Sequence, residues 1–155
     1  MPGYGLPEGN KGLLPWKWAA DRLKKSHNYW ITTVKPDCAP HVMVVWGLWL
    51  NGVFLFSTGR QSRKARNLSG NQHCAVSTEL AHEAVILEGI AEEVREIALR
   101  RKFIKLCEAK YQYDLSAFEE GILSLKEPIY GVRPQVVFGL DEKKSLPAAT
   151  RWNFV

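Results

Sequence analysis

The segment from residue 57 to 72, STGRQSRKARNLSGNQ, contains the residues of this sequence with the clearest chemical potential. Four cations stand within seven positions with no acid among them, namely Arg60, Arg63, Lys64 and Arg66. We expect a helix to begin near Ser62, and the free N–H groups and positive dipole end of a helix N-terminus repel cations and attract anions. The residues expected to hold a phosphate group here are Ser57, Thr58, Ser62, Arg63 and Lys64.

The strength of such a site indicates what the ligand must carry besides phosphate. Hydrogen bonds to charged groups contribute roughly 1.5–3 kcal/mol each, and the dipole adds about 0.3–1 kcal/mol. Two cations and the dipole therefore give roughly 3–7 kcal/mol, whereas micromolar affinity needs about 8 kcal/mol. We expect an apolar or aromatic body attached to the phosphate. Two other interpretations stay open from the residues alone: a basic helix face in water, or weak binding of nucleic-acid phosphates.

Composition bounds the class of protein. The chain has 155 residues, which suits one domain, and we expect a flexible arm at 1–12 followed by a single domain at 13–155. Residues 1–78 hold ten Lys/Arg and three Asp/Glu, so the basic charge lies in the first half. Three cysteines without CxxC spacing argue against disulfides, and no stretch resembles a signal peptide or a membrane span. The expected location is the cytoplasm.

Hydrophobic patterning predicts mostly hairpin-connected strands, hence an antiparallel barrel with added helices. Strands are expected at 27–35, 41–50, 53–58, 73–79, 83–94 and 129–140, the last interrupted by Pro134, and helices at 13–25, 96–113 and 115–125. Asn51-Gly52 is a strong hairpin signal. The strand at 41–50 is apolar at both parities, so both of its faces should be covered inside a barrel, by a helix or by another subunit.

Several polar residues are expected to have no special role. The acids at positions 88, 92, 93 and 96 should face solvent, as should the basic residues 100, 101, 102 and 105 on the longer helix. Cys38 and His41 have a C-x-x-H spacing, but no second pair completes a zinc site, so no metal is expected.

The order of strand HVMVVWGLW, turn Asn51-Gly52, strand FLFST and segment SRKARNL resembles the pyridoxamine 5′-phosphate oxidase-like split-barrel superfamily. The resemblance covers roughly residues 15–140. It implies a mainly β protein with flanking helices (α+β), an antiparallel split β-barrel that forms a homodimer with its cofactor between the subunits. The expected cofactor is FMN, with the deazaflavin F420 as the alternative.

The resemblance also assigns residues to the cofactor. Ser57, Thr58, Arg63 and Lys64 would hold its phosphate, with Ser62 as a nearby hydroxyl. Further contacts are expected from Met43, Val44, Val45 and Trp46 to the ring, from Thr78 at the end of the following strand, and from Trp152 in a tail that could fold over the cofactor or simply pack on the barrel.

The expected activity is a two-electron oxidoreductase acting on a small organic substrate, with no nucleic acid or membrane as partner. A cofactor of this type carries the hydride chemistry itself, so no catalytic acid or base is named. The alternative is a non-catalytic flavin- or haem-binding or sensor protein. Trp46 replaces a lysine of true pyridoxine phosphate oxidases, and their C-terminal arginine-x-histidine motif is absent, so the resemblance does not identify pyridoxine phosphate as the substrate.

Overall fold

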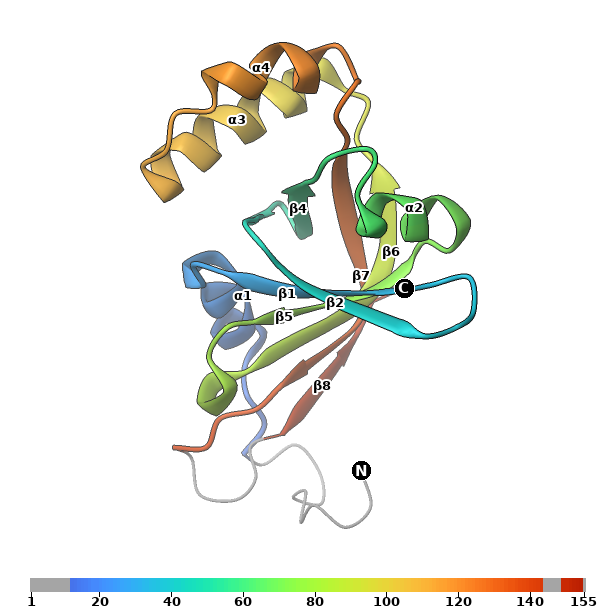
Figure 1. Ribbon diagram of the computed structural model, residues 1–155. Coiled ribbons are helices and arrows are strands. Elements are labelled where there is room, and N and C mark those ends of the chain that lie inside the picture. Colours follow the sequence, from blue (N-terminus) through green and yellow to red (C-terminus); the bar gives the residue numbers. More distant parts are fainter. Residues whose placement is uncertain (1–11, 144–148, 155) are drawn as a thin grey trace.

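Eight antiparallel strands form one sheet, which curls into a half-barrel in the computed structural model (Figure 1). The structure describes residues 12–143 and 149–154, so the arm expected at 1–12 lies outside the described residues except for Gly12. The strands are β1 (Tyr29–Val34), β2 (Pro40–Val45), β3 (Leu48–Leu50), β4 (Val53–Ser57), β5 (His73–Thr78), β6 (Val85–Glu93), β7 (Ile129–Gly139) and β8 (Thr150–Asn153).

The order of the strands explains the curvature. Along the sheet it is β2-β1-β5-β6-β7-β4-β3, with β8 paired to β7. The two strands at the ends of this order, β2 and β3, follow each other in the chain with only Trp46 and Gly47 between them. The chain therefore joins the two ends of the sheet. The predicted class, a mainly antiparallel split barrel with flanking helices, is confirmed.

In the part of the chain that the structure describes, four α-helices flank the sheet: α1 (Trp16–Lys25), α2 (Arg63–Gly70), α3 (Ile97–Tyr111) and α4 (Ser116–Leu123); a short 3₁₀ helix spans Ala81–Glu83. The helices α3 and α4 lie side by side at one end of the barrel (Figure 1). Among the described residues, no helix combines the length and the apolar character that crossing a membrane would require.

The predicted hairpin at Asn51-Gly52 is confirmed. Leu50 pairs with Val53, and the two residues between them both have positive φ, 50° at Asn51 and 80° at Gly52. Two successive left-handed residues match the twist of the flanking strands, and Asn followed by Gly adopts them at low cost.

The single strand predicted at 41–50 is interrupted, because Gly47 bonds to a helix instead of to a neighbouring strand. Its N–H donates to the Tyr111 hydroxyl on α3 at 2.7 Å. A Cβ at this position would lie 2.2 Å from the buried ring of Phe54, so the close approach requires glycine.

The prediction that Pro134 interrupts the last long strand is wrong, because β7 runs on through a bulge that accommodates the proline. The register between β6 and β7 shifts so that Glu88 pairs with Val136 and Gly89 with Pro134, which leaves Gln135 as the extra residue. Proline inside a sheet is tolerated at such bulges. Gly89 completes the arrangement, since a Cβ there would lie 2.1 Å from the carbonyl oxygen of Arg133.

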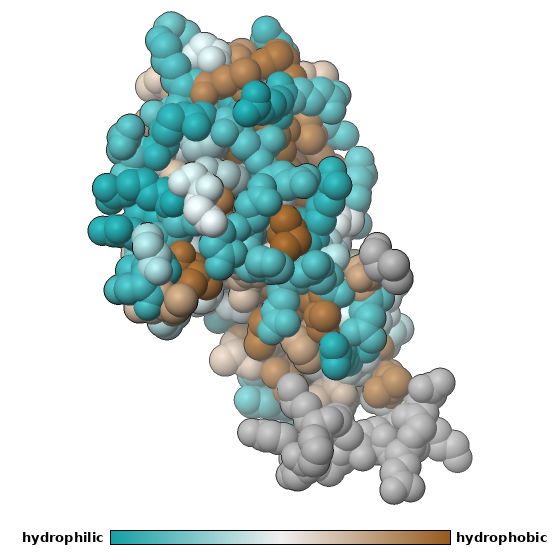
Figure 2. All heavy atoms as spheres, turned by 90° about the vertical axis from the view of Figure 1, so that its right-hand side faces the viewer, coloured by the Kyte–Doolittle hydropathy of each residue, from teal (hydrophilic) through white to brown (hydrophobic). Residues whose placement is uncertain are grey.

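Two apolar clusters form the core. One fills the half-barrel beneath α1 and includes Tyr29, Ile31, Phe54 and Phe56. The other lies between β3, β4 and the helices α3 and α4, and includes Leu55, Phe103 and Ile104. On the face shown in Figure 2, hydrophilic side chains predominate and hydrophobic ones form separate patches, one of them across the end that carries the two helices.

The expectation that Arg100 lies on the wet face of the longer helix is wrong. Its side chain is fully buried, and its guanidinium donates to the carbonyl oxygens of Val94, Ile122 and Glu127 at 2.6, 2.5 and 2.9 Å. Arg100 thereby ties α3 to the end of β6, to the last turn of α4 and to the segment between α4 and β7.

Candidate functional site

The step from β4 to α2 brings two hydroxyls to the N-terminus of a short helix. Ser62 is the N-cap residue, as predicted, and its Oγ accepts the backbone N–H of Ala65 at 3.2 Å. The Thr58 hydroxyl donates to the same Oγ at 3.0 Å. The first helical N–H groups, those of Arg63 and Lys64, have no acceptor within the helix because a helix N-terminus leaves them free. The step therefore presents hydroxyl and N–H donors together.

The cations on this helix have no carboxylate partner within the described residues. None of the ion pairs found there includes Arg63, Lys64 or Arg66. Arg63 and Arg66 are exposed, whereas Lys64 is half-buried, and this burial lowers the pKa of Lys64. The positive charge of a partly desolvated lysine beside a helix N-terminus is unfavourable, and a bound anion would compensate it.

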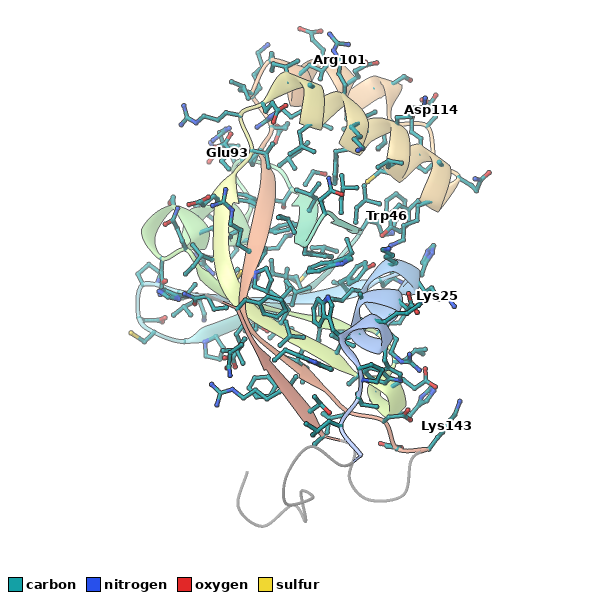
Figure 3. The ribbon with its side chains drawn as sticks, turned by 180° about the vertical axis from the view of Figure 1, so that it is seen from behind. Lys25, Trp46, Glu93, Arg101, Asp114 and Lys143 are labelled. Carbon is teal, nitrogen blue, oxygen red and sulfur yellow. The ribbon has the colours of Figure 1, made fainter. Side chains whose placement is uncertain are left out.

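Arg60, the fourth cation of the segment, is held by other groups. Its guanidinium pairs with Glu93 at 2.9 Å and donates to the carbonyl oxygens of Leu125 and Lys126 at 2.7 Å each. Its backbone N–H donates to Oε2 of Glu127 at 2.8 Å. Glu93, expected to face solvent, instead joins Arg60 to the buried Arg100 and marks where β6 leaves the sheet (Figure 3). These contacts fix the loop that leads into α2.

Helix α2 is anchored to the barrel through its inner face. Ala65, Asn67 and Leu68 are buried, and the side-chain amide of Asn67 donates to the Thr33 hydroxyl on β1 at 2.9 Å. Because β1 pairs with β2, the helix stands one strand away from the apolar edge strand. The anion-attracting step is thus attached rigidly to the part of the sheet predicted to contact a cofactor ring.

A cleft of about 540 Å³ opens between the end of β4, the connection from α3 to α4, and α4 itself. Ser57, Thr58 and Gly59 form one wall, and most of the remaining surface is apolar or aromatic. Thr58 belongs both to this cleft and to the step at α2. A cleft of this volume suits a small organic ligand.

Trp46 reaches the cleft from the interruption between β2 and β3 and lies beneath α3 in Figure 3. Its ring stacks on Tyr111 with centroids 4.4 Å apart and planes 7° from parallel. Tyr111 is fixed in turn, since its hydroxyl accepts the Gly47 N–H and lies 2.8 Å from the His27 carbonyl oxygen, to which it can donate. Lys110 adds a bond from Nζ to the Gly47 carbonyl at 2.9 Å. The interruption therefore sets the position of the indole.

The other residues predicted on this strand differ in burial along its length. Val45 is buried in the core, whereas Met43 and Val44 are 45% and 47% exposed, and Val42 beside them is 50% exposed. The predicted cover for both faces of the strand is thus missing over β2 in a single chain. The sequence suggested three possible covers for this strand: the barrel interior, a helix or another subunit. Only the last of these lies outside what the structure of one chain can contain.

Thr78 and Trp152, both predicted to contact the cofactor, lie apart from the cleft and from the step at α2. Thr78 is buried, its hydroxyl accepts the Val85 N–H at 3.0 Å, and it borders a different hollow together with Glu79. Trp152 lies on β8, a strand that the sequence analysis missed, and its ring meets Trp16 edge to face at 5.5 Å. Within one chain Trp152 packs on the barrel. Ser57, Thr58, Ser62, Arg63, Lys64 and Trp46, by contrast, lie in one region.

The helical wall of the cleft was not foreseen. Tyr113 and Phe118 line it from the α3–α4 connection and from α4. The signal in the sequence was weak: both are aromatic residues in the otherwise polar stretch YQYDLSAFEE. Aromatic side chains in such surroundings are more informative than those in apolar runs, because burial in the core does not explain them.

Known protein structures share this fold. An F420 reductase is 23% identical, with a TM-score of 0.61, and the match covers 85% of this chain and 98% of that one. The conserved hypothetical protein Rv2991 from Mycobacterium tuberculosis is 20% identical, with a TM-score of 0.74 and coverage of 89% and 92%. The haem storage protein HutZ from Vibrio cholerae is 16% identical, with a TM-score of 0.61 and coverage of 80% and 91%.

Sequence comparison extends the assignment from fold to family. No curated protein sequence matches the chain. The sequence profile of the pyridoxamine 5′-phosphate oxidase family, however, matches residues 17–138, which contain the interrupted strand pair, the step at α2 and the cleft. The chain therefore belongs to the pyridoxamine 5′-phosphate oxidase family.

Proposed function

We propose that this protein binds a phosphorylated flavin-type cofactor, FMN or alternatively F420, at the step between β4 and α2, and that it is an oxidoreductase acting on a small organic substrate. One observation carries the proposal. Arg63 and Lys64 stand at the N-terminus of α2, without a carboxylate partner in the described part of the chain, next to the hydroxyls of Thr58 and Ser62.

The electrostatics of the step favour a phosphate ligand. Without an anion, the two cations repel each other and the helix dipole, and Lys64 is partly desolvated. A phosphate reverses the sign of each of these contributions, and two charge-assisted bonds with the dipole amount to roughly 3–7 kcal/mol. The remainder needed for micromolar binding, of about 8 kcal/mol in total, falls to contacts with the cofactor's ring.

The residues present fit such a cofactor. Arg63, Lys64 and the free N–H groups of the first helical turn bind the phosphate, and Thr58 and Ser62 orient it. Met43, Val44 and Trp46 offer exposed apolar surface for the ring. The bound cofactor supplies two-electron hydride chemistry, and the protein contributes position and exclusion of water. Among the structural relatives, the F420 reductase supports a redox cofactor of this type.

The exposed edge strand supports a second copy of the chain as the missing cover. Trp30 and Val44 are cross-strand partners on β1 and β2, and both are about half exposed, as is Val42. An apolar edge strand left open invites pairing with another chain. We infer that two copies associate through this surface and enclose the cofactor between them. Light scattering at micromolar concentration should give twice the monomer mass, and a monomer would contradict the inference.

The HutZ likeness makes a non-catalytic haem-binding protein the second candidate. The same cations could pair with the carboxylates of a haem. Titration with hemin followed by absorbance spectroscopy separates the two. A saturable shift of the Soret band, together with no binding of FMN or F420, would favour the haem protein.

Alanine substitutions at the step test the cofactor assignment. The double substitution Arg63→Ala and Lys64→Ala removes two charge-assisted bonds, so affinity for FMN or F420 should fall at least a hundredfold. The matched control is Arg66→Ala, which removes an exposed cation two residues after Lys64 on the same helix and should change affinity less than threefold. Circular dichroism checks that both variants fold. Unchanged affinity in the double variant refutes the assignment.

A further inference from the structure

We propose that the cleft between residues 57–59, the α3–α4 connection and α4 is the substrate site, and that the substrate is an uncharged aromatic molecule. This inference rests on the proposed function, because it names the class of compound on which the bound cofactor acts. It is carried by three properties of the cleft: its aromatic walls, its charge and its place beside the step at α2.

The walls carry aromatic rings that folding leaves in water. Trp46, Tyr113 and Phe118 are 41%, 49% and 51% exposed, and they come from three different segments of the chain. Trp46 and Tyr113 meet edge to face at 5.5 Å, and the stack on Tyr111 holds the indole in place. Rings fixed in this way bind flat aromatic molecules through stacking and edge contacts in addition to area burial.

The charge of the cleft excludes an anionic substrate. Of its described lining residues, Glu127 is the charged one, and no cation is among them. The nearest arginine of the adjacent loop, Arg60, is paired with Glu93 and two backbone carbonyls. A phosphorylated ring would therefore meet a carboxylate without a compensating cation, and burial of such a charge is unfavourable.

The position of the cleft links it to the cofactor. Thr58 lines the cleft and donates a hydrogen bond to Ser62, the N-cap of the helix that carries Arg63 and Lys64. Ser62, Arg63 and Lys64 lie outside the cleft lining, whereas Thr58 and Trp46 belong to it, so the bound cofactor would border the cleft at these two residues. The opposite wall, with Tyr113, Leu115 and Phe118, remains for a second molecule in the volume of about 540 Å³. This volume lies within the range of small-molecule sites.

A matched pair of probes tests the proposal: 2-naphthol, which is neutral, and 2-naphthyl phosphate, which adds charge to the same ring. Calorimetric titration of the wild-type protein with bound cofactor should show 2-naphthol binding at least tenfold tighter, because the cofactor's phosphate then occupies the step at α2 and only the cleft is open to the probes. Phe118→Ala should weaken 2-naphthol binding two- to tenfold. Leu80→Ala is the control, since Leu80 is also about half exposed but lies outside the cleft. Glu127→Gln should strengthen binding of 2-naphthyl phosphate.

The outcomes separate this inference from the proposed function. Equal binding of the two probes, or unchanged 2-naphthol affinity in Phe118→Ala, overturns the proposal of an aromatic substrate site. The proposed cofactor function is then still supported if FMN or F420 binds. Conversely, wild-type protein that binds 2-naphthol but neither FMN nor F420 refutes the proposed function and with it the assignment of the cleft to a substrate. If Phe118→Ala instead lowers the mass measured by light scattering, the cleft is a contact between copies and the proposal is wrong.

Discussion

Glu93 joins two arginines that differ sharply in exposure, and the substitution Glu93→Gln tests what holds the loop before α2. Oε1 of Glu93 lies 2.9 Å from Nη2 of Arg60 and 3.3 Å from Nη2 of Arg100. The Arg60 side chain is 43% exposed, whereas that of Arg100 is fully buried. Glutamine keeps the size and one acceptor oxygen of the side chain but removes the negative charge that both guanidinium groups face.

The expected loss of stability in Glu93→Gln follows from the different exposures of the Arg60 and Arg100 side chains. The contact with Arg60 is worth at most about 1 kcal/mol, because solvent screens an exposed pair. A hydrogen bond to a charged group such as Arg100 contributes about 1.5–3 kcal/mol. Arg100 keeps three backbone carbonyl acceptors, so the loss stays below the 3–5 kcal/mol typical of a fully orphaned buried charge. We expect the free energy of unfolding at neutral pH to fall by about 2–3 kcal/mol.

Urea denaturation of the variant and of a matched control measures this loss. Glu92→Gln alters the neighbouring position on β6, where the carboxylate lies 3.5 Å from Arg133 and both side chains are more than half exposed. This control should lose less than about 0.5 kcal/mol. The reasoning is refuted if Glu93→Gln and Glu92→Gln unfold at the same urea concentration.

The dependence on pH gives a second readout. The hydrogen bond from Arg60 holds the pKa of Glu93 below its ordinary 4.5, against the opposing effect of burial. A carboxyl with a lowered pKa stabilises the fold above its unfolded pKa, and this stabilisation is lost as the pH falls through the folded pKa. The difference between wild type and Glu93→Gln should therefore shrink below pH 4.5. A stability difference between the two proteins that stays constant down to acid pH would contradict the assignment of this stabilisation to the charge of Glu93.

Three further outcomes are expected. Asn51→Ala should cost about 1 kcal/mol by urea denaturation because alanine disfavours the φ of 50° at the turn, while Asn51→Gly should stay within about 0.5 kcal/mol. Gly89→Ala should cost about 3 kcal/mol or prevent folding, since its Cβ meets the Arg133 carbonyl at 2.1 Å, whereas Gly70→Ala, with open space around it, should be tolerated. Burial lowers the pKa of Lys110 to about 8, so at this position the unfolded chain binds more protons above that pH, whereas the buried thiols of Cys74 and Cys107, with pKa values raised to about 12, act in the opposite direction. The stability of wild type relative to Lys110→Met, measured as the difference in urea midpoints, should therefore rise between pH 8 and 9.5.

The sequence predicted the fold class because its signals are local. Asn51-Gly52 defined a hairpin that the structure reproduces, and Ser62 was identified correctly as the start of a helix. Turn chemistry and helix capping depend on neighbouring residues, so they can be read without knowing the rest of the chain. The cation cluster of Arg63 and Lys64 was visible for the same reason, whereas its ligand remains a proposal.

Errors arose where a distant residue changed a local preference. The apolar run at 41–50 was predicted to be one strand. A hydrogen bond between Gly47 and Tyr111, which are 64 positions apart in the sequence, divides this run into two strands. Pro134 read as an interruption, but an extra residue opposite Gly89 absorbs it. Arg100 was predicted to lie on the surface, but its guanidinium is buried and donates hydrogen bonds to carbonyl oxygens of three separate segments. None of these partners can be identified from the residue's own surroundings in the sequence.

The sequence by itself determined the antiparallel architecture and the cluster of cations at the start of α2, since strand patterning, turns, capping and charge are all set within a few consecutive residues. Only the tertiary structure decided which cation is free and which is engaged: Arg60 is held by Glu93, while Arg63 and Lys64 lack such a partner among the described residues. It also decided that Trp46, Tyr113 and Phe118 meet around one cleft. Both outcomes depend on which distant segments the folded chain brings together, and this is fixed by packing of the whole barrel and its helices.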